Sequence, residues 1–319
     1  MLNTLLRTHW GIHADCVQAL PCGHTNKTYF VAHGSRCAVL RLSWPGKSVE
    51  HVEKEAAVLR HLGAATGLPA TPQAIASLDG QPYVAGHAGR WLHLFEHIAG
   101  VPGHAEMDSL AVADAMRALA LLHRALARLP CTETSPVAWL RQRLERITAR
   151  PGPALPKRLC ARYPVVLQRI ASLLRQAENW VPDSARWLHG DYHPGNLIWH
   201  GRILRGIVDF DETGSGSQLL EAVFALFALA RNAAIEERLA YDPDLWRAGL
   251  DAYMDDEGRA EWLWQHRSAL ALLFCADQTL IHLEAAQRGL WELRPGIGFL
   301  AGWHELSTGG FSGAGTARG

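Results

Sequence analysis

The sequence lacks an excess of charge of either sign. Among its 319 residues, lysine plus arginine number 31, and aspartate plus glutamate also number 31. A chain without net charge has no overall electric field that draws it to nucleic acid or to an anionic membrane. We therefore expect neither nucleic acid nor a membrane among its partners.

Paired cysteines and long hydrophobic runs are also missing. The six cysteines form no CxxC pair, which is typical of reduced thiols in the cytoplasm. The longest apolar stretches, at 219–230 and 269–276, are shorter than the roughly 20 residues that a membrane-spanning helix needs. The first residues show no signal-peptide pattern. These absences predict a cytoplasmic protein. Whether it is a monomer or a homodimer does not follow from the sequence.

The pattern of the chain changes near residue 100. Before it, short runs of β-forming residues alternate with glycine-bearing turns, and one helix with apolar residues at helical spacing begins at Ser48. After Gly100, helical periodicity dominates. The pattern predicts an α+β fold with a small antiparallel β lobe (1–98), which contains that one helix, a larger and mainly helical lobe (99–306), and a flexible glycine-rich tail (307–319).

Polar residues are concentrated in the stretch 187–212, which reads WLHGDYHPGNLIWHGRILRGIVDFDE. Its second half predicts a hairpin with a turn at 200–202, which would bring Asn196 and Asp209 near each other. Pro194 and Gly195 predict an irregular turn that leaves the Asp191 carboxylate outside the sheet.

These residue types suit one particular chemistry. Asn196 and Asp209 supply hard oxygen ligands, and Mg²⁺ binds few such protein groups while its other positions take water and phosphate oxygens. The separate carboxylate of Asp191 can orient a hydroxyl group and accept its proton. The stretch therefore predicts a magnesium-phosphate site.

The segment HGDYHPGNLIW followed by IVDFD resembles the aminoglycoside phosphotransferase and choline kinase-like superfamily. The resemblance implies a bilobal protein-kinase-like fold, ATP and Mg²⁺ as cofactors, and a small molecule with a hydroxyl group as acceptor. It also implies that Asp191 is the catalytic base, that His189 is the structural histidine of the catalytic loop, and that Asn196 and Asp209 bind Mg²⁺.

The N-terminal part is similar to the nucleotide-binding elements of the same superfamily. LPCGHTNKTYFVA resembles its phosphate loop, with Gly23, Thr25 and Asn26 in register. Arg41 occupies the place of the strand residue that grips the α and β phosphates, and the resemblance implies Glu55 as its ion-pair partner.

LFEHIAG resembles the hinge that hydrogen-bonds adenine. The resemblance therefore implies that the backbone of Glu96, His97 and Ile98 lines the base pocket.

Three positions depart from the superfamily pattern. Cys22 replaces a glycine of the phosphate loop, which predicts a stiffer loop, and Arg41 replaces a lysine, which changes the geometry of phosphate binding. Glu221 stands near the place of an aspartate in the following helix, so the anchoring contact of that helix is in question.

The acceptor stays open at this stage. Tryptophans and acidic residues follow Asp209 in the helical lobe, and such groups suit a cationic amine or amino sugar. Helical tryptophans are more often core residues, however, and acidic residues more often face solvent. An amino alcohol such as homoserine, a neutral sugar and a protein hydroxyl remain alternatives, because the loop also resembles homoserine kinases and stress-response Ser/Thr kinases. The residues concerned are Trp246, Trp262, Trp264, Trp291, Trp303, Asp255, Asp256, Glu257, Glu261, Asp277 and Glu284.

Two other classes of function remain possible. A pseudokinase would bind nucleotide without transferring phosphate, as the replacements at Cys22 and Arg41 suggest. A metal-dependent hydrolase would use His189, Asp191, His193 and Asp209 with a transition metal. Preference for ATP over GTP, and any antibiotic resistance, do not follow from the sequence.

Overall fold

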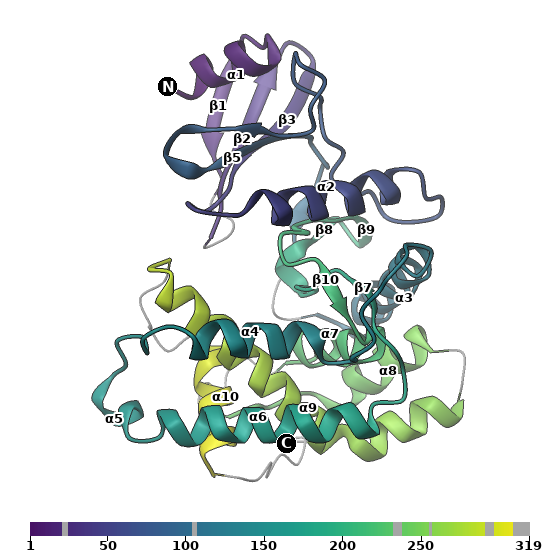
Figure 1. Cartoon of the computed structure of the whole chain (residues 1–319). Helices are drawn as coiled ribbons and strands as arrows, with labels where there is room; N and C mark the ends of the chain where they lie inside the picture. Colours follow the sequence, from purple (N-terminus) through teal and green to yellow (C-terminus); the bar gives the residue numbers. More distant parts are fainter. Residues whose placement is uncertain (21–24, 104–106, 232–237, 255–256, 291–296, 309–319) are drawn as a thin grey trace. The chain divides into compact units, whose positions relative to one another are not determined.

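A computed structural model describes residues 1–20, 25–103, 107–231, 238–254, 257–290 and 297–308 (Figure 1). The chain forms two compact units: unit 1 comprises Met1–Val101 and Ile198–Thr213, and unit 2 comprises Pro102–Leu197 and Gly214–Gly319. We expected the segment Ile198–Thr213 in the larger lobe, but it belongs to unit 1. Its backbone explains this, because Ala70 donates a hydrogen bond to the Arg205 carbonyl and accepts one from Ile207.

Unit 1 is built on one antiparallel sheet in the order β1-β2-β3-β5-β4 (Figure 1). Alternate residues of the two central strands, Ala38, Leu40 and Leu42 on one and Leu92 and Leu94 on the other, are buried in one core cluster, as the period of two in a β-strand requires. The strands are β1 (Cys16–Ala19), β2 (Lys27–His33), β3 (Arg36–Leu42), β4 (Val84–Ala85) and β5 (Trp91–Glu96). In this register Arg41 lies opposite Thr28 on β2 and His93 on β5.

The helix predicted from Ser48 is α2 (Val49–Gly63). The Ser48 hydroxyl caps it by accepting from the His51 N–H, and Glu55 lies on its buried side. Unit 1 contains a further helix, α1 (Leu2–Trp10), which the sequence pattern did not indicate. Trp10 anchors α1 by donating from its indole to the Ile75 carbonyl. A 3-10 turn, η1 (His87–Gly89), precedes β5.

The predicted hairpin is formed by β8 (Leu197–His200) and β9 (Ile203–Ile207), in a sheet ordered β6-β8-β9 with β6 (Val101–Pro102). Its turn contains Gly201 in the left-handed region, at φ 59°. Gly206 on β9 is required by close packing, because a Cβ atom there would lie 2.7 Å from the Ile98 side chain.

Unit 2 is mainly helical, as the periodicity after Gly100 predicts. Two short strands, β7 (Arg186–Leu188) and β10 (Gly214–Gly216), pair with each other, and a 3-10 turn, η2 (Pro194–Asn196), precedes β8. The helices are α3 (Ser109–Leu126), α4 (Ala138–Thr148), α5 (Lys157–Cys160), α6 (Tyr163–Trp180), α7 (Gln218–Leu229), α8 (Pro243–Tyr253), α9 (Glu257–Gln287) and α10 (Ile297–Thr308).

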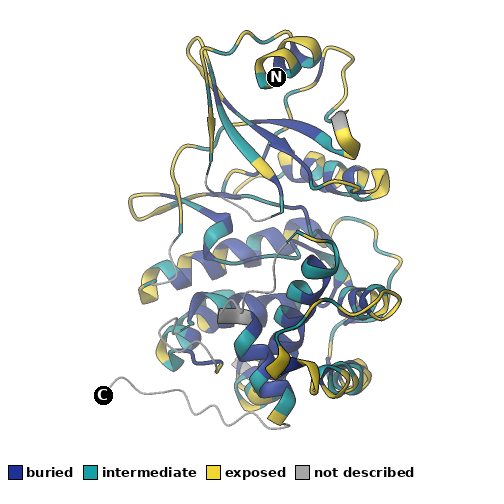
Figure 2. Cartoon of the chain, turned by 90° about the vertical axis from the view of Figure 1, so that its left-hand side faces the viewer, coloured by how far each residue is buried: buried dark blue, intermediate teal, exposed yellow. Residues whose placement is uncertain are grey.

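The core of unit 2 lies among α3, α7, α8 and α9: α7 is buried on all sides, whereas α3, α8 and α9 keep exposed residues on their outer turns (Figure 2). Within α9, Gly258–Gln287 is long and apolar enough to span a membrane, but 67% of the apolar 18-residue window within it is buried in the protein. That burial is typical of a core helix. Of the predicted tail, residues 307 and 308 belong to α10, and 309–319 lie outside the described residues.

Candidate active site

The loop between β7 and η2 is held by its own side chains. His189 is fully buried, and its Nδ1 accepts a hydrogen bond from the Asp191 N–H at 3.2 Å. The Tyr192 hydroxyl donates to the Ala115 carbonyl on α3 at 2.7 Å, and its ring meets the His189 ring edge-on. His189 therefore orients the backbone of Asp191, in keeping with a structural rather than a chemical role.

Asp191 is the one acidic side chain of this loop, and 37% of its side chain is exposed. The Asn196 amide donates to the Asp191 carbonyl at 2.9 Å and to its Oδ2 at 3.2 Å, and His193 Nε2 lies 3.5 Å from the same oxygen. Burial alone would raise the pKa of the Asp191 carboxyl, but His193, His189 and Arg143 together lower it. Asp191 is therefore a deprotonated carboxylate at neutral pH, as a proton acceptor must be.

Glu221 on α7 holds the backbone of the loop between β7 and η2. Its carboxylate accepts from the His189 N–H at 3.0 Å and the Gly190 N–H at 2.5 Å, while His123 Nε2 on α3 lies at 2.8 Å. Burial would raise the pKa of Glu221, but the hydrogen bond and charge of His123 outweigh it and lower the pKa. The longer glutamate thus makes the contact that the departure from aspartate had left in question.

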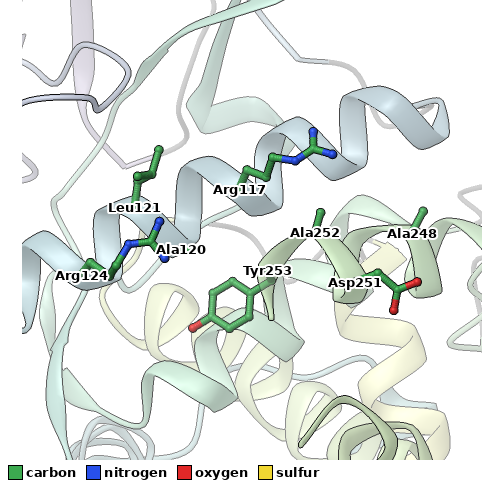
Figure 3. A pocket seen from close by; sticks show the side chains of 8 residues that line it. All are labelled: Arg117, Ala120, Leu121, Arg124, Ala248, Asp251, Ala252 and Tyr253. Carbon is green, nitrogen blue, oxygen red and sulfur yellow. The ribbon is translucent and has the colours of Figure 1, made fainter. Parts of the chain in front are cut away.

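The Glu221 contact continues to Tyr253 on α8. The Tyr253 hydroxyl lies 2.7 Å from His123 Nδ1, and His123 Nε2 lies 2.8 Å from Glu221, so His123 bridges Tyr253 and Glu221. Tyr253 borders a cavity of about 490 Å³ between α3 and α8, with Arg117 and Arg124 on one side and Asp251 on the other (Figure 3). The sequence offered no signal for Tyr253, because its partner His123 is 130 residues away.

Unit 1 brings Arg41 and Glu55 together. Arg41 Nη2 lies 2.6 Å from Glu55 Oε1, and Arg41 Nη1 lies 3.5 Å from Asp209 Oδ1. Burial would raise the pKa of Glu55, but Arg41 and Lys47 lower it well below its usual range. Asp209 adopts a left-handed backbone, at φ 63°, which is uncommon for a residue other than glycine and often marks a functional position.

Two buried residues of this region were missed by the sequence analysis. Lys47 lies between Glu55 and Asp211, forming ion pairs with both. His93 faces Arg41 across the sheet, and burial together with the Arg41 charge lowers its pKa to about 3. Neither residue belongs to a local motif, so periodicity and spacing could not have indicated them.

The expected nucleotide-loop residues are only partly covered. Gly23 and Cys22 lie outside the described residues. Thr25 is half-buried, and Asn26 is buried with its Oδ1 accepting from the Trp44 N–H at 3.2 Å. The Asn26 Nδ2 group has no hydrogen-bond partner among the described residues, so it retains a donor for a ligand.

The expected hinge continues β5. The N–H of Glu96 donates to Gln73 and that of His97 to Cys37, so both are already used. The Ile98 N–H has no such partner in the described parts of the chain. The hinge therefore retains one backbone donor of the kind that an adenine ring accepts.

The residues expected to bind Mg²⁺ have the required atoms. The Asn196 amide nitrogen is committed to Asp191, and its Oδ1 accepts no hydrogen bond from the described residues. The Asp209 side chain is 33% exposed, so its carboxylate is accessible. An amide oxygen and a carboxylate are the donor set that Mg²⁺ prefers. Asn196 belongs to unit 2 and Asp209 to unit 1. Each residue, taken by itself, has an oxygen atom that could bind the ion.

The residues considered for the acceptor divide into core and paired groups. Trp246 and Trp303 are buried core residues, and Trp264 lies between Arg247 and Arg267. Trp262 stacks on His266, and Glu261 accepts from Gln265. Trp291, Asp255, Asp256 and the Glu257 side chain lie outside the described residues.

The acidic residues of α9 are neutralised by arginines. Asp277 pairs with Arg143 at 3.0 Å, and Glu284 is contacted by Arg143, Arg146 and Arg288. Burial would raise the pKa of Glu284, but these arginines lower it. Asp277 and Glu284 therefore supply no surplus negative charge for a cationic acceptor, in contrast to the sequence-based interpretation.

Comparison with known proteins agrees with this arrangement. The sequence profile of the phosphotransferase enzyme family matches residues 17–282, which is more than half of the chain. The chain belongs to this family. Among curated proteins no match was found.

Solved structures show that the family fold extends over nearly the whole chain. A microcompartment-associated aminopropanol kinase aligns with a TM-score of 0.68 and 17% identity, over 96% of each chain. A spectinomycin phosphotransferase in complex with ADP and spectinomycin has a TM-score of 0.59 and 14% identity, over 96% of each chain. An ethanolamine kinase from Plasmodium vivax has a TM-score of 0.62 and 13% identity, over 92% of this chain and 81% of its own. The protein is a phosphotransferase with the protein-kinase-like fold.

Proposed function

We propose that the protein transfers the γ-phosphate of ATP, with Mg²⁺, to a hydroxyl group of a small molecule. The observation that carries this proposal is the geometry of Asp191. Its carboxylate is deprotonated and partly exposed, and the Asn196 amide and the buried His189 hold it in place. A carboxylate fixed in this way can align an acceptor hydroxyl and take its proton as the phosphate is transferred.

The other residues have distinct roles in this proposal. Arg41 binds the nucleotide phosphates, Glu55 holds Arg41 in position, and the Ile98 N–H binds the adenine edge. Asn196 and Asp209 would hold Mg²⁺, which would neutralise negative charge on the phosphates. Glu221 and His189 keep the Asp191 backbone rigid, so that a bound hydroxyl meets the carboxylate without reorganisation.

The acceptor that we propose is an amino alcohol or an amino sugar. Support comes from the structural neighbours, which include an aminopropanol kinase, an ethanolamine kinase and a spectinomycin phosphotransferase. Because Asp277 and Glu284 are already paired with arginines, recognition of the amine must come from other groups, such as the aromatic rings and Glu261 on α9.

The test is phosphate transfer across a panel of acceptors: aminopropanol and ethanolamine, homoserine, choline, aminoglycosides, neutral sugars and a generic protein substrate. ATP and GTP are compared as donors, with product detected by mass spectrometry. Asp191→Asn should abolish transfer while nucleotide binding persists, and Asp114→Asn, an exposed aspartate of the same unit, is the matched control. Nucleotide binding without transfer to any acceptor and without slow ATP hydrolysis would refute the kinase assignment and indicate a pseudokinase. Transfer to protein alone would refute the small-molecule acceptor.

A further inference from the structure

Lys47 is a fully buried lysine in a segment without secondary structure between β3 and α2. Its side chain is 0% exposed, and lysine is almost never found in that state unless it is paired. The backbone is also fixed there: the Lys47 carbonyl accepts from the Trp91 indole at 2.8 Å, and the Gly46 N–H donates to Gly89 at 2.9 Å. The structure thus holds this lysine at a defined place in unit 1.

The ammonium group of Lys47 contacts two carboxylates. Its Nζ lies 3.1 Å from Glu55 Oε2 and in direct contact with Asp211 Oδ1. Burial alone would lower the pKa of Lys47, but Glu55 and Asp211 outweigh it and raise the pKa. Lys47 therefore remains charged, and two of its three N–H donors go to carboxylates.

Glu55 is shared between two cations. Its Oε1 takes Arg41 and its Oε2 takes Lys47, and each cation reaches a different aspartate of the segment 209–211. Five charged side chains thus form one ion-pair network in the order Asp209, Arg41, Glu55, Lys47, Asp211. Through Arg41 and through Lys47, this network connects Glu55 on α2 to the segment 209–211, which carries the proposed magnesium ligand.

The two cations differ in how fully they are used. Arg41 has one close ion pair, a longer 3.5 Å contact to Asp209, and an Nε donor with no partner among the described residues. A buried donor without a partner is costly, and a phosphate oxygen would satisfy it. Lys47, by contrast, makes two close ion pairs, with Glu55 and Asp211, and both partners are protein groups. Arg41 can therefore contact a ligand, whereas Lys47 contacts protein carboxylates.

We propose that Lys47 is a positioning residue of the nucleotide site: it neutralises Asp211 and holds Glu55 in place, so that Arg41 is free to bind phosphate. This proposal rests on the proposed function. Without Lys47, the cluster of two cations and three carboxylates would keep one cation, Arg41, against three carboxylates. The added negative charge would repel a nucleotide polyphosphate, and this effect is separate from metal binding.

The test measures the dissociation constant of metal-free ATP by isothermal titration calorimetry with EDTA present. We expect Lys47→Met to weaken binding by about tenfold or more, and Lys47→Arg to stay within about threefold of the natural protein. Asp211→Asn should leave binding unchanged or tighten it, because it removes a negative charge. The double variant Lys47→Met/Asp211→Asn should recover most of the affinity.

The directions of these changes in affinity distinguish a positioning role of Lys47 from a purely structural one. A structural ion pair predicts that Lys47→Met and Asp211→Asn impair binding alike, and that result would overturn the proposal, as would normal affinity in a folded Lys47→Met protein. Thermal unfolding of each variant reports folding. If Lys47→Met does not fold, the affinities of Asp211→Asn and of the double variant are used instead, since the double variant buries no uncompensated Asp211 charge. Weakened ATP binding in both of these variants would overturn the proposal. A natural protein that binds no nucleotide under any condition would refute the proposed function, and this proposal with it.

Discussion

The two units hold their candidate site residues by different physical means. In unit 1, Arg41, Lys47, Glu55 and Asp211 are almost completely buried and bind one another as ions. In unit 2, Asp191 is partly exposed, and an uncharged amide and the backbone contacts of Glu221 hold its loop. Breaking a buried ion pair leaves an uncompensated charge and costs about 3–5 kcal/mol, whereas a single hydrogen bond to a charged group, such as the one from the Asn196 amide to Asp191, contributes about 1.5–3 kcal/mol. Substitutions in unit 1 should therefore affect stability first, and substitutions in unit 2 should affect chemistry first.

The largest expected effect is on turnover and comes from unit 2. Asp191→Asn should lower kcat by a factor of about 10²–10⁴, because the amide cannot accept the hydroxyl proton. The midpoint of thermal unfolding should stay close to that of the Asp114→Asn control, since Asp191 is partly exposed. A large loss of stability in Asp191→Asn would contradict the contrast between the units.

The largest effect on stability should come from unit 1. Glu55→Gln removes the charge that two buried cations share, so we expect the free energy of unfolding to fall by about 3–5 kcal/mol. Urea unfolding measures this change, and Glu50→Gln, at an exposed position on the same helix, is the matched control. A loss equal to that of the control would show that the cluster contributes nothing to folding.

His93 should make unit 1 sensitive to acid. Its folded pKa of about 3 lies below its ordinary value of 6.5, so the unfolded chain binds the extra proton and stability falls as the pH drops from 6.5 toward 3. The stability advantage over His93→Gln should shrink by roughly 3 kcal/mol between pH 6.5 and pH 4, at about 1.4 kcal/mol per pH unit. Urea unfolding of both proteins at several pH values checks this. A constant difference would mean that His93 does not remain neutral.

The smallest effect should come from Tyr253, at the far end of the Glu221 contacts. Tyr253→Phe removes the hydroxyl that meets His123 and should cost about 0.5–1.5 kcal/mol in unfolding free energy, with a several-fold lower kcat. Tyr29→Phe, which removes a hydroxyl from a half-buried position in unit 1, is the control. Turnover equal to that of the control would show that the contacts of His123 with Glu221 do not depend on Tyr253.

Several features followed from the sequence alone because they depend on neighbouring residues. The cap at Ser48, the hairpin around Gly201 and the change from strands to helices near residue 100 all have local causes: turn chemistry, capping and periodicity. The stretch 187–212 carries Asp191, Asn196 and Asp209 within about 20 positions, so its motif was visible without a structure.

Only the tertiary structure decided which charges are available to a ligand. Lys47 meets Asp211 across 164 positions, and Arg143 meets Glu284 across 141. A sequence shows that such residues carry charge, but it does not show whether that charge is already neutralised, because a buried ion pair depends on long-range packing. The sequence by itself thus determined the motif in 187–212 and the chemistry that it predicts. The fold determined the contacts of Lys47, His93 and Tyr253 and the pairing of the α9 carboxylates.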